Sequence, residues 1–242
     1  MGSAIVGLNV DIPTKIMADI NYDLVNLYNH IQNNLQGFIA HSKALFNPQN
    51  NDSKNFYVWR DLFNQQPKDS LERASLFLYM NRHCYNGVCR YNSSGGFNVP
   101  FGDNSNIGYP QDEITTFSQR MQGTRFLQSD FRHIFDLVEP GDVVYCDPPY
   151  LPLKTNSFVN YSGDGFSMID QVALAECART ASARGATVII SNHDVPIVDE
   201  LYKGAFIRRL SVRRSVSRDG KNRNNAKEIL AIFQPAVVTP QS

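Results

Sequence analysis

Apolar side chains recur at helical spacing along the first third of the chain. Asn21 can cap the first predicted helix, whose apolar face begins at Leu24. The same spacing predicts further helices at Leu35–Phe46, Ser53–Asn64 and Ser70–Cys84. Ahead of these helices, short apolar or β-branched runs predict two strands, at Ala4–Val10 and Lys15–Ala18.

From about residue 111 the pattern changes to strands that alternate with helices. Helices are predicted at Gln111–Gln122, from Asp130, at Ser167–Arg184 and at Pro196–Tyr202. Strands are predicted at Thr124–Gln128, Val143–Cys146, Thr187–Ser191, Phe206–Val212 and Glu228–Phe233. Such alternation is typical of an α/β fold with a largely parallel sheet that helices cover on both faces. The last two strands are expected to form an antiparallel edge pair.

A segment of different composition separates these two parts. Residues 85–110 are rich in Asn, Gly, Ser and aromatic residues, and they predict a hairpin that turns at Ser93–Gly96. Pro100 limits the pairing of the second strand, because proline has no backbone N–H. Taken alone, the pattern fits an ordinary surface hairpin.

The composition is that of an ordinary globular protein. The 242 residues, 42% hydrophobic and 19% charged, can form one substantial core, as one domain or as a domain with an inserted module. No apolar run is long enough to cross a bilayer, and the N-terminus lacks the features of a signal peptide. The four cysteines form no C-x-x-C pair, and Cys84 and Cys89 have no further metal ligands nearby. We therefore expect a cytoplasmic protein with no membrane contact and no bound metal.

The charge is balanced overall but unevenly distributed. Between Lys203 and Lys227, nine basic residues accompany a single acid, Asp219. One interpretation is a solvated surface strand and turn. The other is a patch, with Arg213 and Arg214 at its centre, that contacts the phosphates of a nucleic acid.

The predicted strand Val143–Cys146 runs directly into Asp147, Pro148, Pro149 and Tyr150. Ligands of open α/β sheets bind beyond the carboxyl ends of strands, so this stretch lies where such folds hold their sites. Asp147 is an ionised acceptor, and the fixed φ of Pro148 sets the direction of its carbonyl. Two adjacent acceptors suit an exocyclic NH₂ group, and the flat ring of Tyr150 can stack on an aromatic base. The stretch therefore fits the amino edge of a nucleobase.

Such an amine is a poor nucleophile because its lone pair is delocalised into the ring. Hydrogen bonds from both N–H groups to fixed acceptors free the lone pair, and they stabilise the positive charge that develops as nitrogen attacks an electrophilic carbon. A duplex buries this amine, so the base has to be flipped out or presented single-stranded. As a bare string, DPPY also fits an ordinary proline turn.

Four sequence motifs supply the context. In chain order they are ADINYDLVNLYN, LFLYMNRHCYNGVCRYNSSGGFNVPFG, CDPPYLPL and ISNHD. Together they resemble the Dam family of DNA adenine-N6 methyltransferases, and the likeness extends from the first residues nearly to the C-terminus. The resemblance implies S-adenosylmethionine as methyl donor, GATC in double-stranded DNA as target, and a Rossmann-like sheet with one reversed strand. We expect the protein to act as a monomer.

The resemblance also implies roles for residues of the catalytic part. By position, Asp147 and Pro148 would hold the target N6, and Tyr150 would stack on the flipped adenine. Asp19, in ADIN, would bind the ribose hydroxyls of the donor, and a helix cap is its alternative role. The other expected donor contacts are Gly2, Ile20, Asp130, Phe131 and again Asp147.

In the hairpin, the resemblance implies contacts with DNA. Tyr85 resembles the residue inserted beside the flipped base, and Arg90 resembles the reader of guanine, because a guanidinium can bond O6 and N7 together. The other expected DNA contacts are Asn86 and Asn92 to the backbone and Val88 and Pro100 to bases. Without the resemblance, Arg90 is more simply a solvated surface residue.

The resemblance predicts a catalytic domain, residues 1–34 and 111–242, and an inserted target-recognition module, residues 35–110. The sequence differs from the family pattern at its start, where members carry a K-W-x-G-G-K segment and an F-x-G-x-G donor loop. Here MGSA stands at the loop position, so Gly2 matches one glycine and Ala4 replaces the other. Three functions remain open: an active GATC methyltransferase, a DNA-binding relative with weak or no donor binding, and an amino-methyltransferase for RNA or relaxed DNA sites.

Overall fold

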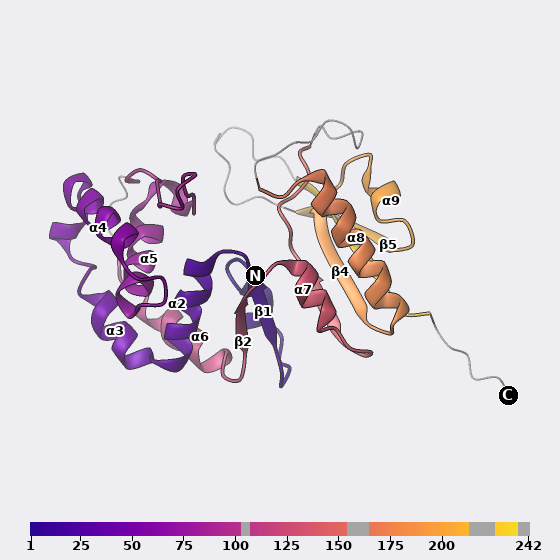
Figure 1. Ribbon diagram of the computed structural model, residues 1–242, viewed down its shortest axis with the longest axis horizontal. Helices are drawn as coiled ribbons and strands as arrows, with labels where there is room; N and C mark the ends of the chain where they lie inside the picture. The colour runs from indigo at the N-terminus through magenta and orange to yellow at the C-terminus, as the bar shows by residue number, and fades with distance from the viewer. Residues whose placement is uncertain (103–106, 154–164, 213–225, 237–242) are drawn as a thin grey trace. The chain divides into compact units, whose positions relative to one another are not determined.

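The structure is a computed structural model that describes residues 1–102, 107–153, 165–212 and 226–236. It divides into two units, Met1–Asp130 and Phe131–Ser242 (Figure 1). The predicted domain boundaries at residues 35 and 111 lie inside the first unit and stay a prediction.

Helices make up most of the first unit. They are α1 (Ile5–Leu8), α2 (Tyr22–Asn33), α3 (Leu35–Lys43), α4 (Ser53–Gln65), α5 (Leu71–His83) and α6 (Gln111–Arg120), with 3₁₀ turns η1 (Pro48–Asn50) and η2 (Tyr85–Gly87). The sequence predicted α2 to α6 because their apolar residues repeat at helical spacing. Asn21 caps α2 as expected, since its side-chain oxygen accepts hydrogen bonds from the N–H groups of Asp23 and Leu24.

A parallel pair of strands completes the first unit. β1 (Ile16–Asp19) pairs with β2 (Arg125–Gln128), with Ile16 opposite Arg125 and Asp19 opposite Gln128. Aromatic rings join this pair to the helices: the ring centroid of Tyr28 lies 4.6 Å from that of Phe117. Both side chains are buried, so the pair belongs to the core beneath β1 and β2.

The predicted strand at Ala4–Val10 is wrong. Residues Ile5–Leu8 form the short helix α1, in which the Leu8 N–H bonds the Ala4 carbonyl at 2.9 Å. Gly7 packs so closely on Met17 that an added Cβ would lie 2.6 Å from its sulfur. The β-branched residues Ile5 and Val6 lie exposed, so β propensity did not decide the local structure.

The second unit contains a four-stranded sheet with helices packed against it. Its strands are β3 (Val143–Cys146), β4 (Thr187–His193), β5 (Phe206–Val212) and β6 (Ala226–Phe233), in the order β3-β4-β6-β5. β3 and β4 are parallel, whereas β6 is antiparallel to both β4 and β5. The described strands therefore confirm an α/β fold with one reversed strand, and the last two strands form the predicted antiparallel pair.

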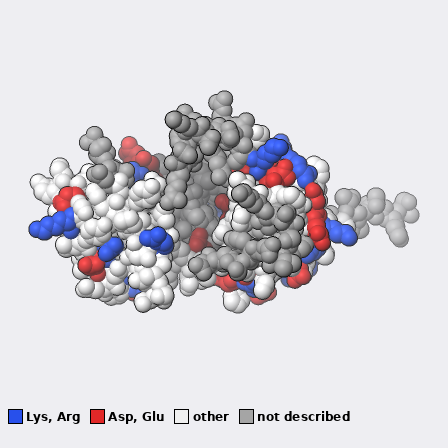
Figure 2. Space-filling model, turned by 90° about the horizontal axis from the view of Figure 1, so that it is seen from above, with Lys and Arg blue, Asp and Glu red and all other residues white. Residues whose placement is uncertain are grey.

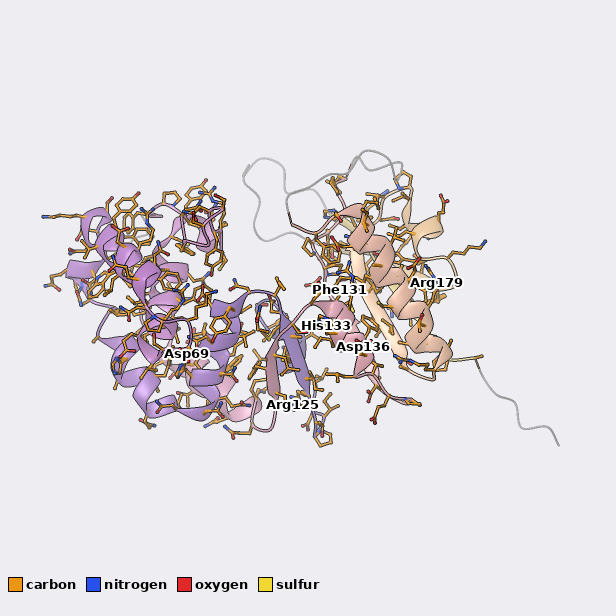
Figure 3. The ribbon with its side chains drawn as sticks, viewed as in Figure 1. Asp69, Arg125, Phe131, His133, Asp136 and Arg179 are labelled. Carbon is orange, nitrogen blue, oxygen red and sulfur yellow. The ribbon has the colours of Figure 1, made fainter. Side chains whose placement is uncertain are left out.

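Three helices lie in the described part of the second unit: α7 (Phe131–Asp136), α8 (Met168–Ala183) and α9 (Val198–Leu201). α8 lies along β4 (Figure 1). Phe131, His133 and Asp136 lie along α7, and Arg179 of α8 donates a hydrogen bond to the Leu201 carbonyl of α9 at 3.3 Å (Figure 3). No helix in the described ranges is long and apolar enough to span a membrane.

Candidate functional site

The Asp147 carboxylate lies immediately beyond the carboxyl end of β3. The Ser191 hydroxyl, from the neighbouring strand β4, lies 2.6 Å from Asp147 Oδ1 and 3.2 Å from the Cys146 carbonyl oxygen. Ser191 is buried whereas Asp147 is exposed. A buried donor therefore fixes one oxygen of an exposed carboxylate, and the other oxygen can accept a hydrogen bond from a ligand.

The backbone that follows Asp147 is held by two buried amide side chains. The Leu151 N–H donates to Asn192 Oδ1 at 2.8 Å, and Gln171 Nε2 donates to the Pro149 carbonyl at 2.8 Å. Asn192 also donates to the Tyr202 hydroxyl at 2.9 Å. Asn192 and Gln171 are both 0% exposed, so these hydrogen bonds are shielded from water and fix the direction of the loop.

Two acceptors of the DPPY stretch are available to a ligand. In the described part of the chain, neither Asp147 Oδ2 nor the Pro148 carbonyl has a hydrogen-bond partner. Next to them, the Tyr150 ring is half-buried and meets the His193 ring edge to face, with centroids 4.9 Å apart. Burial raises the pKa of Tyr150 to about 12, so its ring carries no charge at neutral pH. The stretch thus combines two acceptors with one neutral aromatic ring.

A second predicted site lies in the first unit, at the end of β1. Asp19 Oδ2 accepts a hydrogen bond from the Gly2 N–H at 2.9 Å, and Asp19 Oδ1 accepts one from the Asn21 N–H at 2.9 Å. The Tyr28 hydroxyl donates to the Gly2 carbonyl at 2.8 Å. The structure therefore brings together Gly2 and Asp19, which lie far apart in the sequence.

Helix capping does not explain Asp19, because Asn21 caps α2. Gly2 has φ +52°, and an added Cβ there would meet nothing within 4 Å, so open space adjoins its backbone. Ile20 is 68% exposed beside them. A half-buried carboxylate, a glycine backbone and an exposed apolar side chain therefore lie together at the end of β1.

The other two expected donor contacts fall in different units. Asp130 ends the first unit, and Phe131 begins the second unit at the start of α7. The ring centroids of Phe131 and Phe166 lie 5.6 Å apart, and the Arg132 guanidinium lies 4.4 Å from the centroid of the Phe131 ring. Their role beside the adenine of a donor stays a prediction.

The hairpin presents the predicted DNA contacts on the surface. All of them are exposed: Tyr85, Asn86, Val88, Arg90, Asn92 and Pro100. Phe97 and Val99, by contrast, are buried in the core of the first unit. The segment pairs at two single bridges, Tyr91 with Phe97 and Cys84 with Phe101, so it is a hairpin without the two regular strands that we expected.

Two asparagines shape the exposed side of this hairpin. Asn92 Oδ1 accepts hydrogen bonds from the N–H groups of Ser94 and Gly96, so only its side-chain NH₂ can reach a phosphate. Asn98 binds Arg90 twice: Arg90 Nε donates to Asn98 Oδ1 at 2.8 Å, and Arg90 Nη2 donates to the Asn98 carbonyl at 3.2 Å. These two bonds fix one edge of the guanidinium, and the role of Arg90 as a reader of guanine stays a prediction.

The basic segment is only partly described. Arg213 and Arg214 lie outside the described residues, so their prediction is untested. Arg209, inside β5, pairs with Asp199 at 2.7 Å and with Asp194 at 3.2 Å. Lys and Arg lie beside Asp and Glu on the face shown in Figure 2. The charge of Arg209 is therefore matched by carboxylates of its own unit, and the phosphate-contact interpretation of the segment stays a prediction.

Comparison with known proteins decides the family. The family described as D12 class N6 adenine-specific DNA methyltransferase matches residues 1–216. The chain belongs to this family. It is 42% identical to a DNA adenine methylase of Vibrio cholerae over 237 residues, which are 97% of this chain and 85% of the relative. It is 39% identical to a DNA adenine methylase of Escherichia coli K12 over 241 residues, 99% of this chain and 86% of the relative.

Family membership makes this chain a DNA (adenine-N6) methyltransferase, so DNA is its substrate class. Sequence reasoning named the DPPY residues but not Ser191, Gln171 and Asn192, which hold them. The motif ISNHD contains Ser191 and Asn192, but the sequence does not show which groups they bind. In the described ranges, no cluster of three His, Cys, Asp or Glu residues could hold a metal ion.

Proposed function

We propose that this methyltransferase acts in the cytoplasm on GATC in double-stranded DNA, with S-adenosylmethionine as donor, and that it flips the target adenine out of the duplex. The DPPY stretch carries the proposal: Asp147 Oδ2 and the Pro148 carbonyl are two acceptors beside a neutral aromatic ring. The relatives named DNA adenine methylase support an adenine target.

The proposed chemistry rests on hydrogen bonds to the exocyclic amine. Asp147 and the Pro148 carbonyl each accept one N–H of the adenine N6, which frees the nitrogen lone pair. As nitrogen becomes positively charged, the Asp147 carboxylate stabilises it, so this interaction is stronger in the transition state than in the ground state. Tyr150 stacks on the flipped base, and this contact replaces the stacking on neighbouring bases that the adenine loses when it leaves the duplex.

The residues at the end of β1 fit the donor. Asp19 would bind its ribose hydroxyls, the backbone of Gly2 would approach it closely, and Ile20 would contact its apolar surface. S-adenosylmethionine supplies an electrophilic methyl group when bound. The contribution of this chain is to bind and orient the two reactants.

One experiment separates the three functions that the sequence leaves open. The purified chain is incubated with labelled donor and with a GATC duplex, a scrambled duplex or an RNA of the same sequence. The proposal predicts label in the GATC duplex alone. Equal label in all three would favour a relaxed enzyme. Salt-sensitive DNA binding without donor binding in calorimetry would favour a silent DNA-binding relative.

Replacing Arg90 by alanine is expected to relax sequence discrimination. A bidentate Arg–guanine contact contributes about 1–3 kcal/mol of discrimination against the wrong base, so the preference for GATC over a near-cognate site should fall about five- to 150-fold. Competition binding between a GATC duplex and a near-cognate duplex measures this ratio of affinities. Arg208→Ala on β5 is a charge-matched control that should weaken binding to both sites equally or not at all. An unchanged ratio for Arg90→Ala would exclude Arg90 as the reader.

A further inference from the structure

A buried ion pair in the first unit joins α2 to α5. Asp23 and Arg73 are 4% and 6% exposed. Arg73 Nη2 donates to Asp23 Oδ2 at 3.1 Å, and Arg73 Nε donates to Asp23 Oδ1. Arg73 Nη1 also donates to the Phe63 carbonyl at 2.9 Å, which fixes the guanidinium on α4. The carboxylate of Asp23 therefore has a rigid position.

The hairpin supplies a third hydrogen bond to this carboxylate. The Tyr91 hydroxyl donates to Asp23 Oδ2 at 2.7 Å. Tyr91 lies between Arg90 and Asn92, two of the predicted DNA contacts. Burial raises the pKa of Tyr91, so its hydroxyl stays a donor at any physiological pH.

The same network reaches the turn at the end of β1. The Asp23 N–H donates at 3.0 Å to Asn21 Oδ1, the oxygen that caps α2, and the Tyr91 hydroxyl lies 3.4 Å from the same oxygen. The N–H of Asn21 is in turn bonded to Asp19 Oδ1. A continuous set of hydrogen bonds thus connects the predicted donor-binding turn, residues 19–21, with the predicted base-reading segment, residues 90–92.

Stability alone does not require this arrangement. Asn64 of α4 already holds the hairpin: its Oδ1 accepts the Phe97 N–H at 2.8 Å, and its Nδ2 donates to the Phe97 carbonyl at 3.2 Å. A buried ion pair is often no more stable than apolar side chains of the same volume. The Tyr91 hydroxyl adds a direct bond between the hairpin and Asp23 of α2, which the bonds of Asn64 do not supply.

We propose that the Tyr91–Asp23 hydrogen bond couples donor binding at the 19–21 turn to DNA binding by the hairpin. A donor that orders the turn thereby orders the base-reading segment. DNA then binds a segment that has already lost conformational entropy, so each ligand strengthens the binding of the other. The inference rests on the proposed function, because it uses the donor role of Asp19 and the DNA role of the hairpin. Tyr91 is a positioning residue in this scheme and contacts neither substrate.

The test measures DNA affinity with and without a donor analogue. A fluorescent GATC duplex is titrated with the chain, in the absence and in the presence of saturating S-adenosylhomocysteine. We expect S-adenosylhomocysteine to tighten DNA binding about fivefold or more in the unmodified chain. In Tyr91→Phe, which keeps the half-buried ring and loses only the hydroxyl, this ratio should fall close to one.

Asn64→Ala is the control, because it loosens the hairpin at Phe97 and keeps the hydrogen bond of the Tyr91 hydroxyl. It should weaken DNA binding equally with and without S-adenosylhomocysteine, so the ratio is retained. Asp23→Leu should lose the ratio as Tyr91→Phe does, because leucine offers no acceptor to the Tyr91 hydroxyl. A thermal melt of each variant checks that the chain is folded.

The results separate this inference from the proposed function. A chain that binds no S-adenosylhomocysteine or no DNA would contradict the proposed function and the coupling with it. A chain that binds both independently would overturn the coupling alone. A full ratio in Tyr91→Phe, or a ratio lost equally in Asn64→Ala, would also overturn it.

Discussion

Replacing Asp147 by alanine is expected to lower the rate of methyl transfer by about 100- to 1,000-fold or more, because the main acceptor for the developing positive charge is lost. DNA affinity should stay the same, since most of the affinity comes from contacts with phosphates. Single-turnover incorporation of labelled methyl into a GATC duplex measures the rate, and a DNA titration measures the affinity.

Ser191→Ala is the matched companion to this variant. It removes one hydrogen bond to Asp147 Oδ1 and leaves the carboxylate in place. A net hydrogen bond of about 1 kcal/mol corresponds to a rate lower by about five- to tenfold, with little change in the affinity for DNA. If Asp147→Ala retained the rate of the unmodified chain, or lost no more than Ser191→Ala, the assigned role of Asp147 would be wrong.

Replacing Arg73 by alanine is expected to cost about 3–5 kcal/mol of unfolding free energy, because Asp23 would remain buried without its cationic partner. The change would also remove the guanidinium from the Phe63 ring, which it covers at 4.1 Å from the centroid. Denaturant unfolding followed by the fluorescence of Trp59, which lies in the same unit, measures this loss.

Arg209→Ala provides the surface comparison. Arg209 also pairs with carboxylates, but its side chain is 49% exposed, so removing it should change the unfolding free energy by less than about 1 kcal/mol. Equal losses for Arg73→Ala and Arg209→Ala would show that the buried pair does not have the expected energetic role.

The helices and strands that the sequence predicted correctly have one property in common. Their apolar residues repeat with the period of the element, and several carry a local cap, as Asn21 does for α2 and Ser70 does for α5. The error at Ala4–Val10 arose where the signal was propensity alone. There, the close packing of Gly7 against Met17 and local hydrogen bonds favoured a helical turn.

The candidate sites were predicted unevenly for a similar reason. Asp147, Pro148 and Tyr150 are contiguous in the sequence, so their chemistry can be read from a short string. Asn192 and Gln171 act on the same loop from β4 and α8, and only the folded chain brings them to it. A buried Asn or Gln has no sequence signature apart from its neighbours, because its partners are backbone groups at distant positions.

The same limit applies to the network around Asp23. Asp23, Arg73 and Tyr91 come from α2, α5 and the hairpin, and each is an ordinary residue of its own segment. Charged residues are expected on the surface when they are judged one at a time, whereas these two are buried as a pair. Only tertiary contacts show that they connect α2, α5 and the hairpin.

The most direct test of the proposed activity identifies the methylated atom. A duplex with one GATC site is incubated with the chain and S-adenosylmethionine, digested to nucleosides and analysed by mass spectrometry. The DPPY geometry predicts that the modified nucleoside is N6-methyl-2′-deoxyadenosine, and the proposed GATC specificity predicts none of it from a scrambled duplex. Methylated cytosine, or unmodified adenine in a duplex that the donor-bound chain demonstrably holds, would contradict it.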